Sequence, residues 1–353
     1  MKTTFKEIEI RRRYWQCRCG SDGGYLADDI LGLQGRHSRV LQKHACRLAA
    51  DVSFAKSSEH IEEMLLVKIC PETLRTIVEN HGAAMARFQP TDTVSIENFQ
   101  KAEGEVEFTI DAGKVNTCED GWKDLKIGVI QKRKSGEPIE LGNWDKERLP
   151  APTARLAFAR IASIKSFSRD WPECLRRLGV DQWAELHVLG DGASWIWKAV
   201  ERKLTGCVQT LDIYHASERL SKAAKRLFGE GTVETKAAFE RGRALLIANG
   251  WQGVCQWIGE YLIVDDITEQ ERRRKVLEGV TVYFSKHTTR LNYAERLASG
   301  RAIGSGAVEG EAKTLGLRLK ARGARWRRSN VRSMSALVCG RYSDHWEAYW
   351  TAA

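Results

Sequence analysis

Apolar residues recur at helical spacing through the first third of the chain. Between residues 27 and 88, positions such as Leu41 and Ala45 are four residues apart, which places their side chains on one face of an α-helix. A short turn separates two such segments, and Pro71 opens the second, where a missing backbone N–H costs nothing. The pattern predicts an all-α, helix-turn-helix-like region that ends in a linker at residues 89–104.

From residue 105 the pattern changes to short apolar runs that alternate with helical segments. The runs predict strands at 108–110, 125–130, 139–141, 186–189 and 208–213. Helical periodicity predicts helices at 153–167, 170–178, 194–204 and 215–228. Three strands in succession, followed by helix, strand, helix, strand and helix, predict a ribonuclease-H-like mixed sheet.

Residues 232–297 are mainly helical in pattern and are punctuated by glycines such as Gly250. Because no strand pattern extends the sheet there, we predict an α/β fold whose core is interrupted by a helical insertion. The expected organisation is a short basic segment at 1–25, a helical DNA-binding region and linker at 26–104, the first part of the core at 105–230, the insertion at 231–300, and the completion of the core at 301–353.

The composition is that of an ordinary soluble globular protein, with 42% hydrophobic and 29% charged residues among 353. No apolar run approaches the roughly 20 residues of a membrane helix, and the N-terminus has no apolar signal core. We therefore expect no membrane partner and a cytoplasmic location. Nine scattered cysteines indicate reduced thiols, and the net charge of +10 favours an anionic partner, most simply nucleic acid.

Two cysteines, Cys17 and Cys19, lie beside Gly20 in the basic N-terminal segment. Such a pair is typical of half a zinc knuckle, but the spacing is Cys-x-Cys rather than Cys-x2-Cys, and no second pair lies nearby. The alternative, free thiols on a hairpin, is favoured over a Zn²⁺ site.

Three acidic residues occur in an order suited to metal binding. Asp111 leaves the first predicted strand, Asp191 follows a later one, and Glu309 opens a helix after a glycine-rich turn. If they meet at one sheet edge, their oxygens could hold two Mg²⁺ or Mn²⁺ ions for phosphoryl transfer. The alternative for each residue alone is a capping role, as for Asp191 near Ser194.

Asp212 and His215 form a further polar pair at a predicted strand–helix junction. Asp212 is a rival metal ligand, and His215 could support the same site. A satisfied polar pair with a structural role alone is the equally compatible alternative.

The segment from Lys313 to Arg341 carries cationic residues and no acidic one. They are Lys313, Arg318, Lys320, Arg322, Arg325, Arg327, Arg328, Arg332 and Arg341. This density favours contacts with DNA phosphates, whereas a solvated face is the alternative. Trp326 could stack on an unpaired base or pack in the core. In the helix-turn-helix-like pair, Arg75 and Thr76 are the candidates for contact with a DNA groove.

Three groups of motifs resemble the DDE transposases of bacterial insertion sequences, specifically the ISKra-type group. They are Ile110-Asp111-Ala112-Gly113 with 122–128, Gly190-Asp191-Gly192-Ala193-Ser194-Trp195-Ile196-Trp197 with 212–218, and Gly304-Ser305-Gly306-Ala307-Val308-Glu309-Gly310. The likeness extends from about residue 14 to Trp350. Members of this group usually carry paired Cys-x2-Cys motifs in a longer N-terminal region, from which Cys17-Arg18-Cys19 departs.

This resemblance implies a ribonuclease-H-like core, dependence on Mg²⁺, and the acidic triad Asp111, Asp191 and Glu309. It also implies cleavage and joining of transposon ends and target in double-stranded DNA, near the bacterial nucleoid, by a dimer or larger assembly. Two alternatives stay open: a nuclease on the same core without strand joining, and a decayed transposase that only binds DNA.

Overall fold

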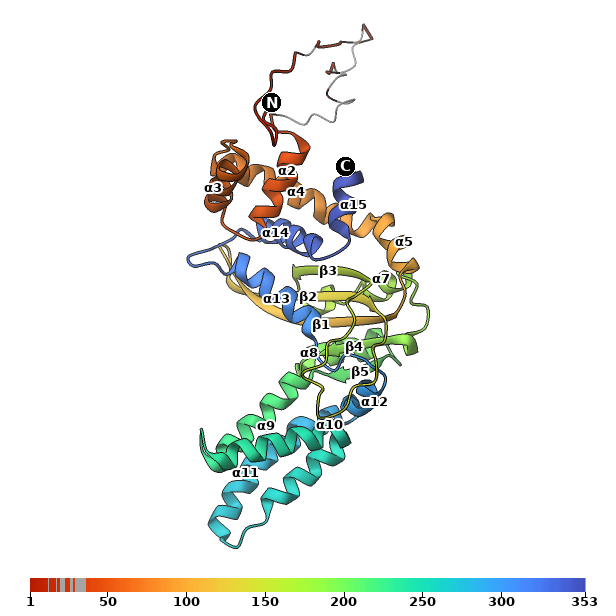
Figure 1. Ribbon diagram of the computed structural model, residues 1–353, viewed down its shortest axis with the longest axis vertical. Coiled ribbons are helices and arrows are strands. Elements are labelled where there is room, and N and C mark those ends of the chain that lie inside the picture. Colours follow the sequence, from red (N-terminus) through yellow and green to blue (C-terminus); the bar gives the residue numbers. More distant parts are fainter. Residues whose placement is uncertain (12, 17, 20–22, 26–27, 29–35, 353) are drawn as a thin grey trace.

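The computed structural model describes residues 1–352 except 12, 17, 20–22, 26–27 and 29–35. The protein has an α/β fold around a five-stranded mixed sheet with the order β3-β2-β1-β4-β5 (Figure 1). Its strands are β1 (Glu105–Thr117), β2 (Gly121–Arg133), β3 (Ala154–Ile161), β4 (Leu186–Gly190) and β5 (Val208–Leu211). The first three are antiparallel neighbours, whereas β4 is parallel to β1 and β5 is parallel to β4.

Helices cover both faces of this sheet. On one face, Phe108 and Ile110 of β1 belong to a core shared with α6, α7 and α8. On the other, Val115 and Ile127 belong to a second core shared with α13 and α14. Burial on both faces explains the continuous apolar runs of β1 and β2 in the sequence. These helices are α6 (Ile164–Phe167), α7 (Trp171–Arg177), α8 (Ser194–Lys203), α13 (Gly306–Leu319) and α14 (Arg328–Arg341).

The N-terminal helices stack on α14, on the side away from the sheet (Figure 1). They are α2 (Arg39–Ala49), α3 (Phe54–Leu65), α4 (Pro71–Phe88), the 3₁₀ turn η1 (Gln89–Thr91) and α5 (Thr93–Lys101), with the C-terminal α15 (His345–Ala352) beside them. The predicted linker at 89–104 is wrong for most of its length, because α5 forms there. Phe99 of α5 is fully buried. The Asp92 carboxylate caps the start of α5 by accepting a hydrogen bond from the backbone N–H of Ser95 at 3.0 Å.

The third strand is β3, so the prediction of a strand at 139–141 is wrong, and that of a helix at 153–167 is wrong except at its end, where α6 forms. Residues 154–161 pair with the long β2 over the whole length of β3, although apolar residues spaced three or four apart had indicated a helix. Residues 139–141 instead lie in the loop between β2 and β3. There the backbone N–H of Ile139 donates to the carbonyl of Leu297 at 2.9 Å.

A helical arm extends from the end of β5 (Figure 1). It consists of α9 (Ile213–Phe228), α10 (Val233–Leu262), α11 (Ile267–Phe284) and α12 (Tyr293–Ala298), with the 3₁₀ turn η3 (Ser285–Arg290); another 3₁₀ turn, η2 (Trp183–Glu185), precedes β4. Helix α10 is broken at Gly250 into two antiparallel halves. The indole of Trp257 therefore donates to the carbonyl of Ala238 at 2.8 Å, although the two are 19 residues apart. Among the described helices, none is long and apolar enough to cross a membrane.

Candidate active site

Three aspartates follow paired positions on the three parallel strands. Ile110 of β1 pairs with Gly190 of β4, which pairs with Leu211 of β5. The residue that follows each of these three positions in the chain is an aspartate: Asp111, Asp191 and Asp212. Side chains at paired positions of parallel strands point to the same face, so the register brings these carboxylates to one edge of the sheet.

Glu309 reaches the same edge from the first turn of α13, which packs against β1 and β2. The hydroxyl of Ser305 donates to its Oε1 at 2.9 Å and lies 3.0 Å from Asp212 Oδ2. Burial raises the pKa of Glu309, and the carboxylate of Asp212 raises it further. The Gly-Ser-Gly turn before α13 thus attaches the glutamate to the end of β5, a role of Ser305 that the sequence analysis missed although the turn marks its position.

The charges of Asp191 and Glu309 both act on Asp111. Burial is the main cause of its raised pKa, and the negative charges of Asp191 and Glu309 add to the rise. The N–H of Ala112, 2.7 Å from Asp111 Oδ1, and the nearby His215 oppose it. The structure therefore places Asp111, Asp191 and Glu309, which are far apart in the sequence, at the same edge of the sheet, whereas the described ligand atoms that lie within 4.8 Å of one another are those of Asp212, His215 and Glu309.

Asp212 is fully buried, and its carboxylate is saturated with hydrogen bonds. Oδ1 accepts from the backbone N–H of His215 at 2.8 Å and lies 3.0 Å from its Nδ1. Oδ2 accepts from the backbone N–H of Ser305 at 2.6 Å, and the Ser305 hydroxyl, whose one proton can go to Asp212 or to Glu309, lies 3.0 Å away. A carboxylate offers about four lone-pair sites, and here each has a donor within hydrogen-bond distance, one of them this shared hydroxyl. Asp212 is thus placed to organise the site, whereas Asp111 and Asp191 each accept one described backbone N–H and keep free lone pairs.

His215 lies in the first turn of α9 and supplies positive charge beside these carboxylates. Its hydrogen bond to Asp212 is the main cause of a pKa raised to about 9, with further contributions from Asp191 and Glu309. The ligand atoms of Asp212, His215 and Glu309 lie within 4.8 Å of one another and could in principle surround a cation. Because donors surround Asp212 and the pKa of His215 is raised, Asp111, Asp191 and Glu309 are the carboxylates at this edge with lone pairs left to hold a cation.

Most of the predicted cationic segment is exposed to solvent. The exposed residues are Lys313, Lys320, Arg322, Arg325, Arg327, Arg328 and Arg332. Lys313 lies one turn after Glu309 on α13. The guanidinium of Arg328 pairs with Asp120 at 3.1 Å, which holds the segment against the turn between β1 and β2. This arrangement leaves a basic surface on the outer side of α13 and of the loop that follows it.

Arg318 and Trp326 do not belong to this basic surface, because they are 4% and 8% exposed. The Arg318 guanidinium lies 4.8 Å from the ring centres of both Phe54 and Trp326. The Trp326 indole donates to the carbonyl of Leu319 at 3.1 Å. Trp326 therefore packs in the core, the alternative to stacking on a base. Neither Arg318 nor Trp326 is available to DNA in this conformation.

In the helix-turn-helix-like pair, Arg75 lies on α4 and is paired with carboxylates of its own helix, Glu72 and Glu79. A DNA contact by Arg75 would have to displace these partners. Thr76 is exposed one position later, with its hydroxyl bonded to the carbonyl of Glu72 at 3.1 Å. At the N-terminus, Cys17 lies outside the described residues. Cys19 is disulfide-bonded, so the expectation of reduced thiols is wrong for this residue and its sulfur is not a Zn²⁺ ligand in this structure.

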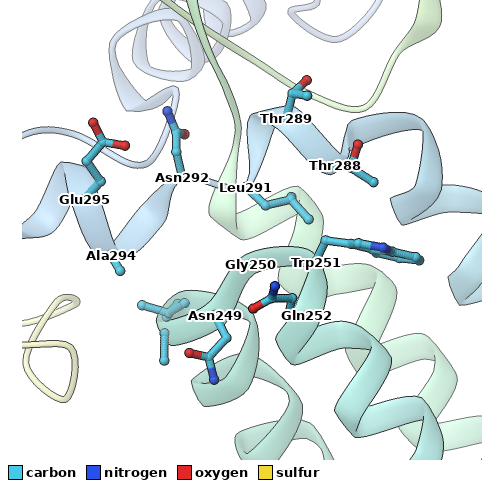
Figure 2. A pocket seen from close by; sticks show the side chains of 12 residues that line it. Asn249, Gly250, Trp251, Gln252, Thr288, Thr289, Leu291, Asn292, Ala294 and Glu295 are labelled. Atoms are coloured by element: carbon cyan, nitrogen blue, oxygen red, sulfur yellow. The ribbon is translucent and has the colours of Figure 1, made fainter.

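A separate cleft of about 590 Å³ lies at the tip of the α10 hairpin, against η3 and α12 (Figure 2). Its labelled lining is largely polar and includes Asn249, Thr288, Asn292 and Glu295. None of the four carboxylates described above lines it. The cleft therefore does not contribute to the acidic site.

Comparison with known proteins gives a family match over part of the chain and assigns no activity. No curated protein matches the chain. The model of an uncharacterised protein family, UPF0236, matches residues 1–126, which include the N-terminal helices and Asp111 but not Asp191 or Glu309.

Proposed function

We propose that this protein is a metal-dependent DNA transposase that cuts a DNA strand and joins its 3′-OH end to target DNA. The observation that carries the proposal is the meeting of Asp111, Asp191 and Glu309 at the carboxyl edge of the parallel strands. The sheet supports a ribonuclease-H-like core, since three antiparallel strands are followed by two strands parallel to the first. The exposed cations after Glu309 support a polyanionic partner.

The residues at this edge fit a divalent cation. Four carboxylates gather there, and the described cation among them is the imidazolium of His215. Burial is the main cause of the raised pKa of Asp111, and the negative charges of Asp191 and Glu309 add to it. Carboxylate oxygens are the ligands that Mg²⁺ and Mn²⁺ prefer. Asp111, Asp191 and Glu309 would hold the ions, and bound Mg²⁺ would supply Lewis-acid activation of water or a 3′-OH toward a phosphate.

The other residues of the site orient and balance these ligands. Asp212 holds the backbone and hydroxyl of Ser305, and Ser305 in turn fixes Glu309. Protonated His215 supplies a cation beside the place where a phosphate would enter, and Lys313 follows one turn after Glu309. No side chain needs to act as a covalent nucleophile, because water and DNA hydroxyls serve as nucleophiles in this class of reaction.

Plasmid nicking tests the proposal directly. The wild-type protein with Mg²⁺ or Mn²⁺ should nick supercoiled plasmid, and Asp191→Asn should reduce the rate by ~100-fold or more, since even outer-shell changes at metal sites cost about 10–100-fold. Asp124→Asn is the matched control, because this β2 carboxylate pairs with Lys114 at 2.6 Å instead of joining the site. Wild-type nicking that survives Asp191→Asn would remove the site assignment.

Strand joining separates the transposase from the nuclease on the same core. Pre-cleaved DNA ends taken from the sequence that flanks the gene, mixed with a target plasmid, should give joined products that need the same three carboxylates. Nicks without joined products would favour the nuclease, and DNA binding without either product would favour a protein that only binds DNA.

A further inference from the structure

The helical arm contributes a tyrosine to the immediate surroundings of the acidic site. Tyr283, near the end of α11, packs so closely on the turn after β4 that a Cβ on Gly192 would lie 2.2 Å from its hydroxyl oxygen. Gly192 directly follows Asp191 in the chain. Burial raises the pKa of Tyr283, and the charges of Asp191 and Asp212 raise it further. The ring of Tyr283 therefore forms part of the edge of the carboxylate cluster.

Arg219 lies on this ring. Its guanidinium carbon is 4.6 Å from the ring centre of Tyr283. Arg219 is on α9, four residues after His215, so the two side chains leave the same face of the helix. The stacked ring limits the motion of the guanidinium, while its remaining N–H donors stay exposed to solvent.

Arg219 has no ion pair within 4.0 Å among the described residues, unlike several cations near it. On the same helix, Lys222 pairs with Glu218 and Lys225 pairs with Glu230, both at 2.6 Å. On α11, Arg272 pairs with Glu269 at 2.6 Å. An oriented, exposed guanidinium with no carboxylate within ion-pair distance among the described residues, beside the acidic edge, is suited to a phosphate, which it can bind through two parallel N–H donors.

We propose that Arg219, oriented by Tyr283, binds a backbone phosphate of the DNA strand that enters the carboxylate site. This inference rests on the proposed function for the identity of the polyanion. It assigns a role to the arm, because α9 and α11 would then form one side of the substrate-binding surface opposite the basic segment after α13. The close approach of Gly192 and Tyr283 would fix the distance between this phosphate contact and Asp191.

Salt-dependent DNA binding tests the proposal. A fluorescein-labelled double-stranded oligonucleotide would be titrated with protein in Ca²⁺ at several NaCl concentrations, and the binding constant followed by anisotropy. Loss of one phosphate contact should lower the slope of log K against log salt by about 0.9. Arg219→Ala and Arg219→Gln should show this change with roughly tenfold weaker binding at low salt. Arg219→Lys should keep the slope, since a lysine also neutralises a phosphate.

Arg176→Ala is the control, because Arg176 on α7 is also stacked on an aromatic ring, that of Trp183 at 5.7 Å, away from the acidic edge. It should leave the slope unchanged. A second measurement uses duplexes with single neutral methylphosphonates. One position should weaken binding to the wild type but not to Arg219→Ala, because both changes remove the same contact.

The two hypotheses fail in different ways. Asp191→Asn should lose nicking but keep the wild-type slope of log K against log salt. A wild-type protein that binds DNA with the expected slope but never nicks it counts against the transposase proposal and leaves the phosphate contact standing. A wild-type slope in both neutral Arg219 variants overturns the phosphate contact, as does an equal loss in Arg176→Ala or a wild type that does not bind the oligonucleotide.

Discussion

Single side chains at the acidic edge divide into those that can bind a cation and those that hold them in place. Asp191 accepts one described backbone N–H, from Ala193 at 2.8 Å, which leaves most of its lone pairs free. Asp212 has the same residue type and an adjacent strand position, but its lone pairs are engaged by His215 and Ser305. The number of donors around each carboxylate, rather than its identity, therefore separates ligand from support.

This difference predicts opposite effects on stability. Asp212→Asn places an amide N–H₂ against the N–H and hydroxyl donors of Ser305 or against those of His215, so we expect a loss of about 1–3 kcal/mol in the free energy of unfolding. Asp191→Asn keeps an acceptor for Ala193 and removes a charge that repels Asp111, so stability should be unchanged or higher. Urea denaturation of the metal-free proteins measures both, and equal losses would contradict this division of roles.

At the scale of elements, the arm depends on a single break in α10. Gly250 has φ 54° and ψ −127°, a conformation that L side chains rarely adopt, and it reverses the helix on itself. A Cβ there would also lie 2.7 Å from the carbonyl oxygen of Leu291, which precedes α12. The reversal aligns the two halves of α10, where Arg241 and Glu260 pair at 2.7 Å.

Two glycine substitutions in α10 should therefore differ in sign. Gly250→Ala combines backbone strain with a clash, and we expect it to lower the free energy of unfolding by about 2 kcal/mol or more. Gly259→Ala, in the second half of the helix with open space around its Cβ position, should raise stability by up to ~1 kcal/mol. Thermal melting followed by circular dichroism compares them, and a neutral Gly250→Ala would argue against the reversal.

For the whole molecule, three histidines beside arginines contribute to the response to acid. The pKa values of His81, His187 and His287 are lowered to about 4, chiefly by burial and then by neighbouring cations. They lie in three separate places: beside α15, between β1 and α12, and between α8 and η3. At each of these positions the folded state favours the neutral imidazole.

The sign of the pH dependence follows from this lowering. Between pH 6.5, the ordinary pKa of histidine, and about 4, the unfolded chain binds more protons than the folded one. The stability associated with these groups is therefore complete above pH 6.5 and is lost as the pH falls toward 4. Urea denaturation at half-unit intervals should show the free energy of unfolding decreasing over this window. A flat profile would contradict neutral histidines at these positions.

Much of the architecture follows from local patterns in the sequence. Apolar runs located β1, β2, β4 and β5, and helical spacing located α8 and α9, because strands buried on both faces and amphipathic helices have distinct periodicities. The order of Asp111, Asp191 and Glu309 relative to these elements was also visible. Local pattern failed at β3, where the spacing of apolar side chains fitted a helix as well as a strand and pairing with β2 decided the outcome. It failed also at α5, where the polar residues at 89–92 indicated a linker and packing on β3 and α15 decided the outcome.

The sequence by itself determined which strands and helices form around the acidic residues and that each carboxylate follows or opens one of them. Only the tertiary structure decided that Asp212 is saturated by His215 and Ser305, and that Tyr283 brings Arg219 to the same edge. These contacts join residues from different elements, up to about a hundred positions apart, so their geometry depends on the parallel register of β1, β4 and β5 and on the packing of the arm. The periodicity of apolar residues cannot predict such distances, because it shows only which residues of one helix or strand share a face.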